Sequence, residues 1–154
     1  MDIEMIGQMK PFNDLAVGTI FLRGDIGIRV SLGGDSGVLL LDQKPAALIV
    51  NGYQFVNKSV LILEKAAIQT ARDRAKWNFG LSLGPQTGFV VISGNSLLLR
   101  ADHPSGHVDV DLLTGLGKHA VANENVAWSE AWRVVINAGA ASETVLLQSA
   151  AWSY

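Results

Sequence analysis

The chain has 154 residues, of which 49% are hydrophobic and only 17% are charged, and its formal net charge is −2. A chain of this length is expected to form a single domain, residues 1–154, with a large buried core. The near balance of twelve basic and fourteen acidic residues argues against nucleic acid as a partner, and no apolar run approaches the roughly 20 residues of a membrane-spanning helix.

Residues 1–12 show no periodicity, so we expect them to form a loosely ordered lead-in. The acidic start Met1–Glu4 is unlike a signal peptide, and a cytoplasmic location is the default expectation. The absence of cysteine excludes disulfides and thiolate ligands. After Leu15, short apolar runs alternate with glycine-rich turns, a pattern typical of the strands of a sandwich or barrel.

This pattern predicts an all-β fold with strands at Gly18–Arg23, Ile26–Leu32, Val38–Asp42, Ala46–Asn51, Ser59–Glu64, Ala67–Ala71, Trp77–Leu83, Gly88–Ser93, Ser96–Asp102, His107–Leu113, His119–Asn123, Ala131–Asn137 and Thr144–Ser149. The stretch Glu64–Lys76 is also rich in good helix formers. Its apolar stripe is too thin to hold a helix against a core, so the strand is the favoured interpretation.

Parts of the chain repeat one another. Leu39–Asp42 recurs as Leu97–Arg100, an offset of 58 residues, and Trp77 is matched by Trp128 at an offset of 51. Such offsets indicate internal repeats of about 55 residues. The units expected from them cover residues 37–94, residues 95–150, and residues 1–36 joined to 151–154.

Three β units, of which the last is completed by both termini, resemble a β-trefoil. The segments that carry the resemblance, which is to the repeat of fascin-type trefoils, are Leu98–Asp102, Gly106–Val108, Val121–Asn123 and Trp132–Val135. The resemblance implies a β-trefoil-like barrel, although the Gln-x-Trp signature of ricin-type lectin repeats is absent. A two-sheet β-sandwich or jelly roll built from a duplication is the alternative.

Trp128 is the centre of the first candidate binding site. Asn123, Asn125 and Glu130 lie close to it in the sequence. Sugars stack their apolar faces on aromatic rings, while amides and carboxylates bind their hydroxyl groups. Asp102 and His103, on another turn, are further candidate ligand-binding residues. Trp132 matches Phe79 in the repeat, so we expect it in the core instead.

His107, Asp109 and Asp111 would share one face of a strand, because side chains alternate along a strand with period two. Imidazole and carboxylate groups in this arrangement could bind a divalent metal and serve a metal-dependent hydrolase. The competing interpretation is an ordinary strand with one solvent-exposed and one buried face. Apart from this possible metal, we expect no cofactor, because no phosphate-binding loop is present.

The sequence therefore favours a non-enzymatic binding module that recognises a carbohydrate or a protein through surface loops. A self-assembling structural subunit is the alternative, and the metal-dependent hydrolase is a minor one. The low share of charged residues also suggests that another copy covers part of the surface, as in a homo-oligomer.

Overall fold

The computed structural model describes residues 7–42, 48–80, 87–104, 106–118 and 126–152, and confirms that the fold is all-β. The strands are β1 (Met9–Pro11), β2 (Ile20–Arg23), β3 (Asp25–Leu32), β4 (Asp35–Leu40), β5 (Leu48–Asn51), β6 (Ser59–Ile62), β7 (Ala66–Thr70), β8 (Asn78–Phe79), β9 (Phe89–Ser93), β10 (Ser96–His103), β11 (Gly106–Asp111), β12 (Gly117–Lys118), β13 (Ala127–Ser129), β14 (Trp132–Ile136) and β15 (Thr144–Gln148). Short 3₁₀ turns occupy η2 (Phe12–Asp14), η3 (Gly52–Phe55) and η4 (Arg74–Lys76).

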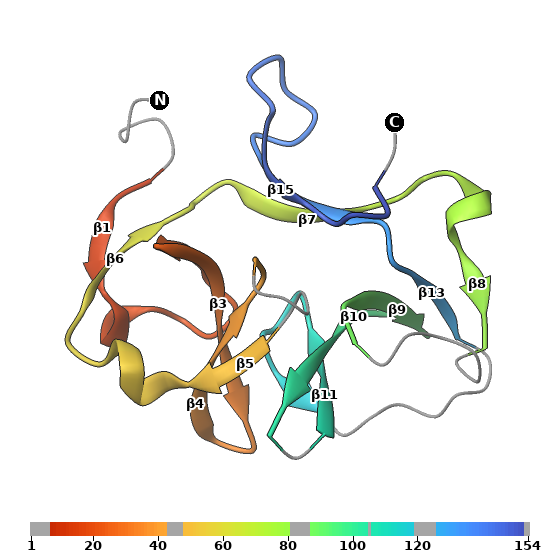
Figure 1. The fold of residues 1–154 in the computed structure, drawn as a ribbon. Coiled ribbons are helices and arrows are strands. Elements are labelled where there is room, and N and C mark those ends of the chain that lie inside the picture. Colours follow the sequence, from red (N-terminus) through yellow and green to blue (C-terminus); the bar gives the residue numbers. More distant parts are fainter. Residues whose placement is uncertain (1–6, 43–47, 81–86, 105, 119–125, 153–154) are drawn as a thin grey trace.

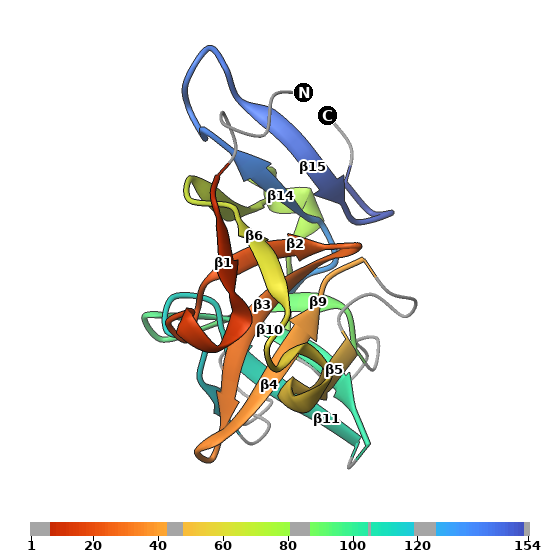
Figure 2. The same cartoon turned by 90° about the vertical axis from the view of Figure 1, so that its left-hand side faces the viewer.

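The strands form two sheets (Figure 1). The larger sheet has the order β1-β6-β2-β3-β4-β5-β10-β9-β13-β8, and β11 and β12 continue from β10 as a branch. The smaller sheet has the order β15-β14-β7 and lies at the top of the molecule in Figure 2, at the opposite end from the β3–β4 and β10–β11 hairpin turns. Among the described residues, neither sheet closes into a barrel.

Two stretches test specific expectations from the sequence. Residues 64–76, which are rich in helix formers, form strand β7 and a single 3₁₀ turn, so the strand prediction is confirmed. The expected lead-in contributes strand β1, which pairs with β6, and Phe12 at its end is only 2% exposed. The predicted strand His119–Asn123 lies outside the described residues.

The pairing of strands occurs twice along the chain. In the first half, β2 pairs with β3 and β6, and β4 pairs with β3 and β5. In the second half, β9 pairs with β10 and β13, and β11 pairs with β10 and β12. The strands β2–β6 therefore correspond one by one to β9–β13.

The registers of the two hairpins match residue by residue. Arg29 pairs with Val38 in the β3–β4 hairpin, and Arg100 pairs with Asp109 in the β10–β11 hairpin, 71 residues later at both positions. Gly18 and Gly88 have positive φ angles of 96° and 86°. Their N–H groups donate to the carbonyl oxygens of Arg29 and Arg100, at 2.7 and 2.8 Å. This spacing differs from the offsets of 51 and 58 residues that the sequence suggested.

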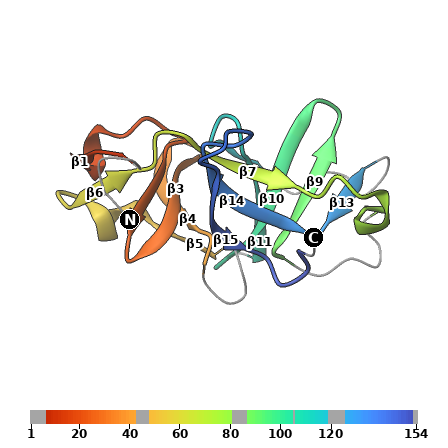
Figure 3. The ribbon, with the colours of Figure 1, turned by 90° about the horizontal axis from the view of Figure 1, so that it is seen from above.

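Strands β7 and β14 join the two halves. They follow the corresponding strands β6 and β13, and they pair with each other antiparallel, with Ile68 opposite Val134 at the middle of the register. An antiparallel pair of corresponding strands is the arrangement that a two-fold axis produces. Seen from above in Figure 3, these strands lie between a half that contains β1, β3, β4 and β6 and a half that contains β9, β10 and β13.

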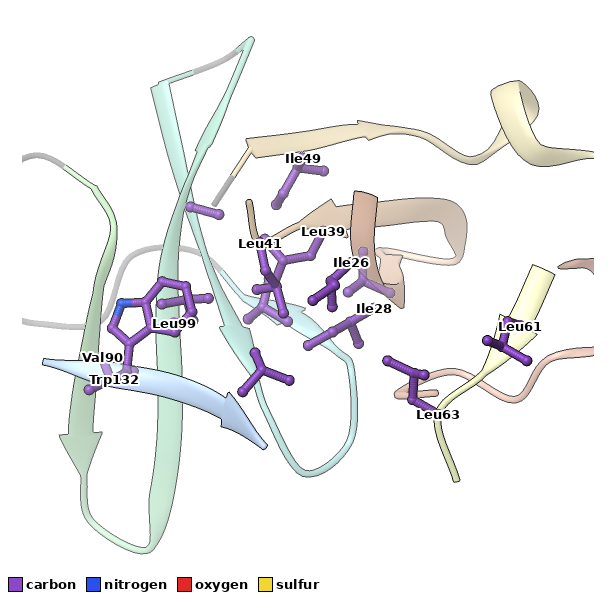
Figure 4. Close-up of a cluster of buried hydrophobic side chains, with 14 residues drawn as sticks. Ile26, Ile28, Leu39, Leu41, Ile49, Leu61, Leu63, Val90, Leu99 and Trp132 are labelled. Atoms are coloured by element: carbon purple, nitrogen blue, oxygen red, sulfur yellow. The ribbon is translucent and has the colours of Figure 1, made fainter. Parts of the chain in front are cut away.

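Three hydrophobic clusters follow the same symmetry. A central cluster includes Leu39, Leu99 and Trp132 (Figure 4). One outer cluster surrounds Phe21 in the first half, and the other surrounds Phe89 in the second. Strands between the central and outer clusters are buried on both faces, so their sequences read as continuous apolar runs instead of alternating with polar residues.

Asp42, which follows β4, gives the stability a pH dependence. Partial burial raises the pKa of its carboxyl above the ordinary value of 3.8, against the lowering effect of the Ile26 N–H that donates to it, and nearby Asp25 adds to the rise. Between 3.8 and the raised pKa the folded state binds more protons than the unfolded state, so the free energy of unfolding decreases as the pH rises through this window.

We expect Asp42→Asn to remove this decrease, because the asparagine oxygen can still accept the Ile26 N–H but has no proton to lose. Urea denaturation at a series of pH values from about 3.5 to 7 measures the difference between wild type and variant. Asp14→Asn, an exposed carboxyl in η2, is the matched control and should keep the wild-type slope. If the free energy of unfolding of Asp42→Asn decreased with rising pH as much as that of the wild type, a group other than Asp42 would be the cause.

None of the helices in the described residues has the length and hydrophobicity that a membrane span requires.

Candidate binding site at the hairpin tips

The turns of the β3–β4 and β10–β11 hairpins lie at the same end of the molecule, below the rest of the fold in Figures 1 and 2. Strand β5 and the turn η3 lie beside them. The pairing of Leu32 with Asp35 and of His103 with Gly106 closes the two hairpins, and the parallel pairing of Asp102 with Leu48 ties the second hairpin to β5. Residues far apart in the sequence are therefore brought together at this end.

A cavity of about 800 Å³ lies between these elements. Asp102 and His103, two of the predicted ligand-binding residues, line it and are partly buried. The Oδ1 atom of Asp102 accepts the backbone N–H of His103 at 3.1 Å, which orients the carboxylate. The remaining lining residues are Leu32, Asp35, Ser36, Gly37, Ile49, Val50, Asn51, Gln54 and Pro104.

A second cavity, of about 520 Å³, shares Asp35, Ser36 and Asn51 with the first. Its other lining residues are Phe12, Asn13, Arg29, Gly52, Tyr53 and Val56. We refer to the two together as the tip cavities. Tyr53 is 82% exposed, so one large aromatic ring at this site is available to a ligand.

Gly52 explains how Tyr53 is held at this site. The side-chain oxygen of Asn51 accepts the Tyr53 N–H at 2.9 Å and begins the 3₁₀ turn. A Cβ atom on Gly52 would lie 2.5 Å from the Ser36 hydroxyl oxygen, so only glycine allows the turn to pack this closely on β4. The Asn-Gly dipeptide is a turn signal that could have identified this segment from the sequence.

Arg29 lines the second cavity and fixes the backbone of the segment around Phe12 and Asn13, which also lines it. Its Nη1 atom donates to the carbonyl oxygens of Phe12 and Asn13, both at 3.1 Å, and to that of Leu15. Its guanidinium also lies over the Phe12 ring, 5.0 Å from the centroid. Sequence reasoning missed Arg29, because an arginine within a strand is usually a solvent-facing residue.

The structure places Trp128 in the outer cluster of the second half. It is 8% exposed, its ring packs edge-on against Phe89 with centroids 5.4 Å apart, and its indole N–H donates to the Gly80 carbonyl at 2.7 Å. Most of the ring is therefore covered by the protein. Trp132 is 1% exposed in the central cluster, as expected.

The predicted partners of Trp128 are placed only in part. Asn123 and Asn125 lie outside the described residues. Glu130 is exposed, and its backbone carbonyl accepts a hydrogen bond from the Ser149 hydroxyl at 2.6 Å.

The strand that carries His107, Asp109 and Asp111 does not have the solvent-exposed face expected of it. His107 is exposed near the hairpin turn, but Asp109 and Asp111 are only 0% and 7% exposed. Asp109 accepts two hydrogen bonds from Arg100, from Nε at 2.7 Å and from Nη2 at 2.9 Å. Burial on both faces of β11 is the physical reason, since each carboxylate has an internal partner.

Asp111 has a structural role in the described part of the chain. Its Oδ1 atom accepts the backbone N–H groups of Leu113 and Thr114, at 2.9 and 3.2 Å, and so holds the turn after β11. Within residues 7–42, 48–80, 87–104, 106–118 and 126–152, no three histidine, aspartate or glutamate side chains form a group that could hold a metal ion.

Comparison of the chain with protein-family models, with curated proteins and with solved structures finds no match in any of the three.

Proposed function

We propose that the protein is a non-enzymatic binding module that recognises a carbohydrate at the tip cavities. The observation that carries the proposal is the junction of two cavities at Asp35, Ser36 and Asn51, with the exposed ring of Tyr53 in one and the polar pair Asp102 and His103 in the other. Concave sites with a few convergent polar groups are typical of small-molecule recognition.

A carbohydrate fits this site better than the flat surface of a protein. An aromatic ring can stack on the apolar face of a sugar, and carboxylate, amide and imidazole groups can bind its hydroxyls. The polar side chains of the site include those at the ends of β4, β5 and β10 next to the hairpin turns, and those of η3, so an elongated ligand could contact both halves of the fold. A protein ligand remains the competing interpretation that the test below separates.

The finer description of the fold that we favour is a duplication of one β unit. The matching pairing of β2–β6 and β9–β13 and the antiparallel pair β7–β14 support it. A duplication is also the basis of the β-sandwich or jelly-roll fold, which is the alternative to the three-unit, β-trefoil-like interpretation. A binding site formed where the two units meet is a natural consequence of such a duplication.

The proposal predicts that labelled protein gives hits on a glycan array and that Tyr53→Ala weakens binding to the best hit at least about tenfold, which is about 1.4 kcal/mol. The physical reason is the loss of the stacking surface, because the ring contributes little to the core at 82% exposed. Isothermal titration calorimetry measures the change.

Phe79→Ala is the matched control. Phe79 is 85% exposed, and its strand β8 pairs with β13, away from the hairpin turns (Figure 1). It should bind as the wild type does. An array without hits, or an equal loss of affinity in both variants, would contradict the proposal.

A further inference from the structure

Strand β7 forms one edge of the smaller sheet. In the described part of the chain it pairs with β14 alone, and β14 separates it from β15 (Figure 3). The N–H group of Ala71 donates to the carbonyl oxygen of Ala131, and hydrogen-bonded pairs alternate along an antiparallel ladder. The backbone groups of Ile68 and Thr70 therefore point away from β14, toward the outer edge of the sheet.

The two edges of this sheet differ in how well they resist the addition of another strand. Neither β7 nor β15 contains a charged residue or a proline. In β15, Leu147 lies opposite Val134 and Val145 lies opposite Val135, so Leu146 forms a bulge. Bulges, charges and prolines are the features by which proteins prevent edge pairing. The register of β7 is regular, so β7 is the edge that remains open to another strand.

An apolar cavity of about 520 Å³ lies beside the outer edge of β7. Its lining includes Ile68 together with Leu97, Leu112 and Leu113, of which Leu113 is 81% exposed, and none of the described residues that line it belongs to β14. Ile68 lies opposite Val134 of the central cluster, so its side chain is on the face of the sheet that points toward the core. An apolar side chain on the same face of an added strand would enter this cavity.

Charged residues of opposite sign flank β7. Glu64 precedes the strand, Arg72 follows it, and both are exposed. The Oε1 atom of Glu64 accepts a hydrogen bond from the side-chain amide of Gln8 at 2.9 Å, which holds the carboxylate at this end of the strand. Glu64 and Arg72 are each four residues from Ile68. In an antiparallel pair of two β7 strands centred on Ile68, Glu64 of each copy therefore lies across from Arg72 of the other.

We propose that two copies of the protein pair through the outer edges of β7, antiparallel and with Ile68 opposite Ile68, to form a two-fold symmetric dimer. The three strands of each smaller sheet then form one continuous sheet. Glu64 and Arg72 attract each other at both ends of the pair, and Ile68 of each copy enters the apolar cavity of the other. A two-fold interface requires a surface that is complementary to itself, and the charges around β7 meet this requirement.

This pairing resembles one that the chain already makes. On its inner edge, β7 pairs antiparallel with β14, and Ile68 is again the residue at the centre of the register. The smaller sheet lies at the opposite end of the molecule from the hairpin turns that carry the tip cavities (Figure 2). The dimer therefore leaves the tip cavities uncovered, and it does not depend on the proposed function.

A charge exchange tests the proposal. Sedimentation velocity of the wild type from about 1 to 500 μM should show a monomer that converts to a dimer as the concentration rises. Glu64→Arg places two arginines across from each other at both ends of the pair, so it should raise the dissociation constant of the dimer at least about tenfold. Arg72→Glu should do the same with two carboxylates. The double variant Glu64→Arg with Arg72→Glu restores opposite charges and should recover most of the affinity.

Glu130→Arg is the matched control. Glu130 is an exposed carboxylate in the turn between β13 and β14, which corresponds to the turn between β6 and β7 that carries Glu64. It undergoes the same change of charge and should leave the dimer unchanged. Thr70→Pro is an independent test, because it removes an outward N–H group and proline is tolerated at the edge of a sheet. It should abolish the dimer, with circular dichroism as the check on folding.

Several results would overturn the proposal. A wild type that stays monomeric over the whole range of concentration would do so. Species that keep growing beyond the dimer would indicate head-to-tail assembly through different edges instead. A dimer that survives Glu64→Arg, or that Glu130→Arg weakens equally, would place the interface elsewhere. The charge variants alter exposed side chains, so the test stays decisive even if Thr70→Pro does not fold.

Discussion

Replacing Asp109 by alanine will decrease the free energy of unfolding by about 3–5 kcal/mol, the usual cost of leaving one member of a buried ion pair without its partner. The side chains of Arg100 and Asp109 are 8% and 0% exposed, so solvent cannot replace the lost carboxylate. Chemical denaturation followed by tryptophan fluorescence measures the loss. Natural domains are stable by only about 5–15 kcal/mol, so this loss is a large fraction of the stability expected of the protein.

The double variant Arg100→Met with Asp109→Leu tests the same ion pair by replacing both of its members. Replacing a buried ion pair by apolar residues of similar size is often neutral or stabilising, so it should recover most of the lost stability. Asp35→Ala, an exposed carboxylate at the tip of the other hairpin, is the matched control and should change the stability by less than about 0.5 kcal/mol. An equal loss in the control would mean that the buried pair does not stabilise the fold.

Replacing Trp132 by alanine should cost about 3–5 kcal/mol, because it removes the largest fully buried side chain and leaves a cavity. Trp132 is part of the central cluster with residues of both halves, including Leu39 and Leu99 (Figure 4). Its indole N–H donates to the Gly88 carbonyl at 3.0 Å, which the variant leaves without this donor. Thermal unfolding and urea denaturation both measure the effect.

Trp132→Phe separates the two contributions. It keeps most of the volume and loses the hydrogen bond, so its cost should be well below that of alanine. Phe79→Ala, at an exposed aromatic residue, provides the surface control and should have little effect on stability. If Trp132→Ala were no more costly than Phe79→Ala, packing in the central cluster could not be a main source of the stability.

Most of the strands could be predicted from local sequence, because glycine turns and short apolar runs are local signals. The strands β3 and β10 and their hairpin turns are clear examples. The faces of the strands could not be predicted. Asp109 looked like a solvent-exposed residue because an alternating pattern assigns it to the polar face. In the folded protein it is 0% exposed and pairs with Arg100, whose guanidinium lies over the Phe89 ring.

The repeat offsets that the sequence predicts differ from the 71-residue spacing at which the strand pairing recurs. Local similarity matched Leu39–Asp42 with Leu97–Arg100, whereas the pairing matches β4 with β11. Arginine is kept at Arg29 and Arg100, but Val38 and Asp109 have opposite chemistry, so a comparison of residue types misses the correspondence. Register depends on long-range pairing, which leaves little trace in either half alone.

Only some residues of the candidate site could be predicted from the sequence. Asp102 and His103 were identified from a dense polar turn, and they line the first tip cavity. Tyr53 and Arg29 were not identified, because they reach the second tip cavity only when η3 and β3 pack beside η2 and the start of β4. The sequence contains these side chains, but it does not show how close together the fold brings them.

The location of the tip cavities has a consequence for how the protein can change over evolution. The residues that stabilise the fold lie in strand interiors, while Asp35 lies at the start of β4, Tyr53 and Gln54 lie in η3, and all three are exposed. Substitutions at these exposed positions alter the shape and charge of the cavities at little cost in stability. The cavities can therefore change over evolution without passing through unfolded intermediates, while the strand interiors stay constrained by packing.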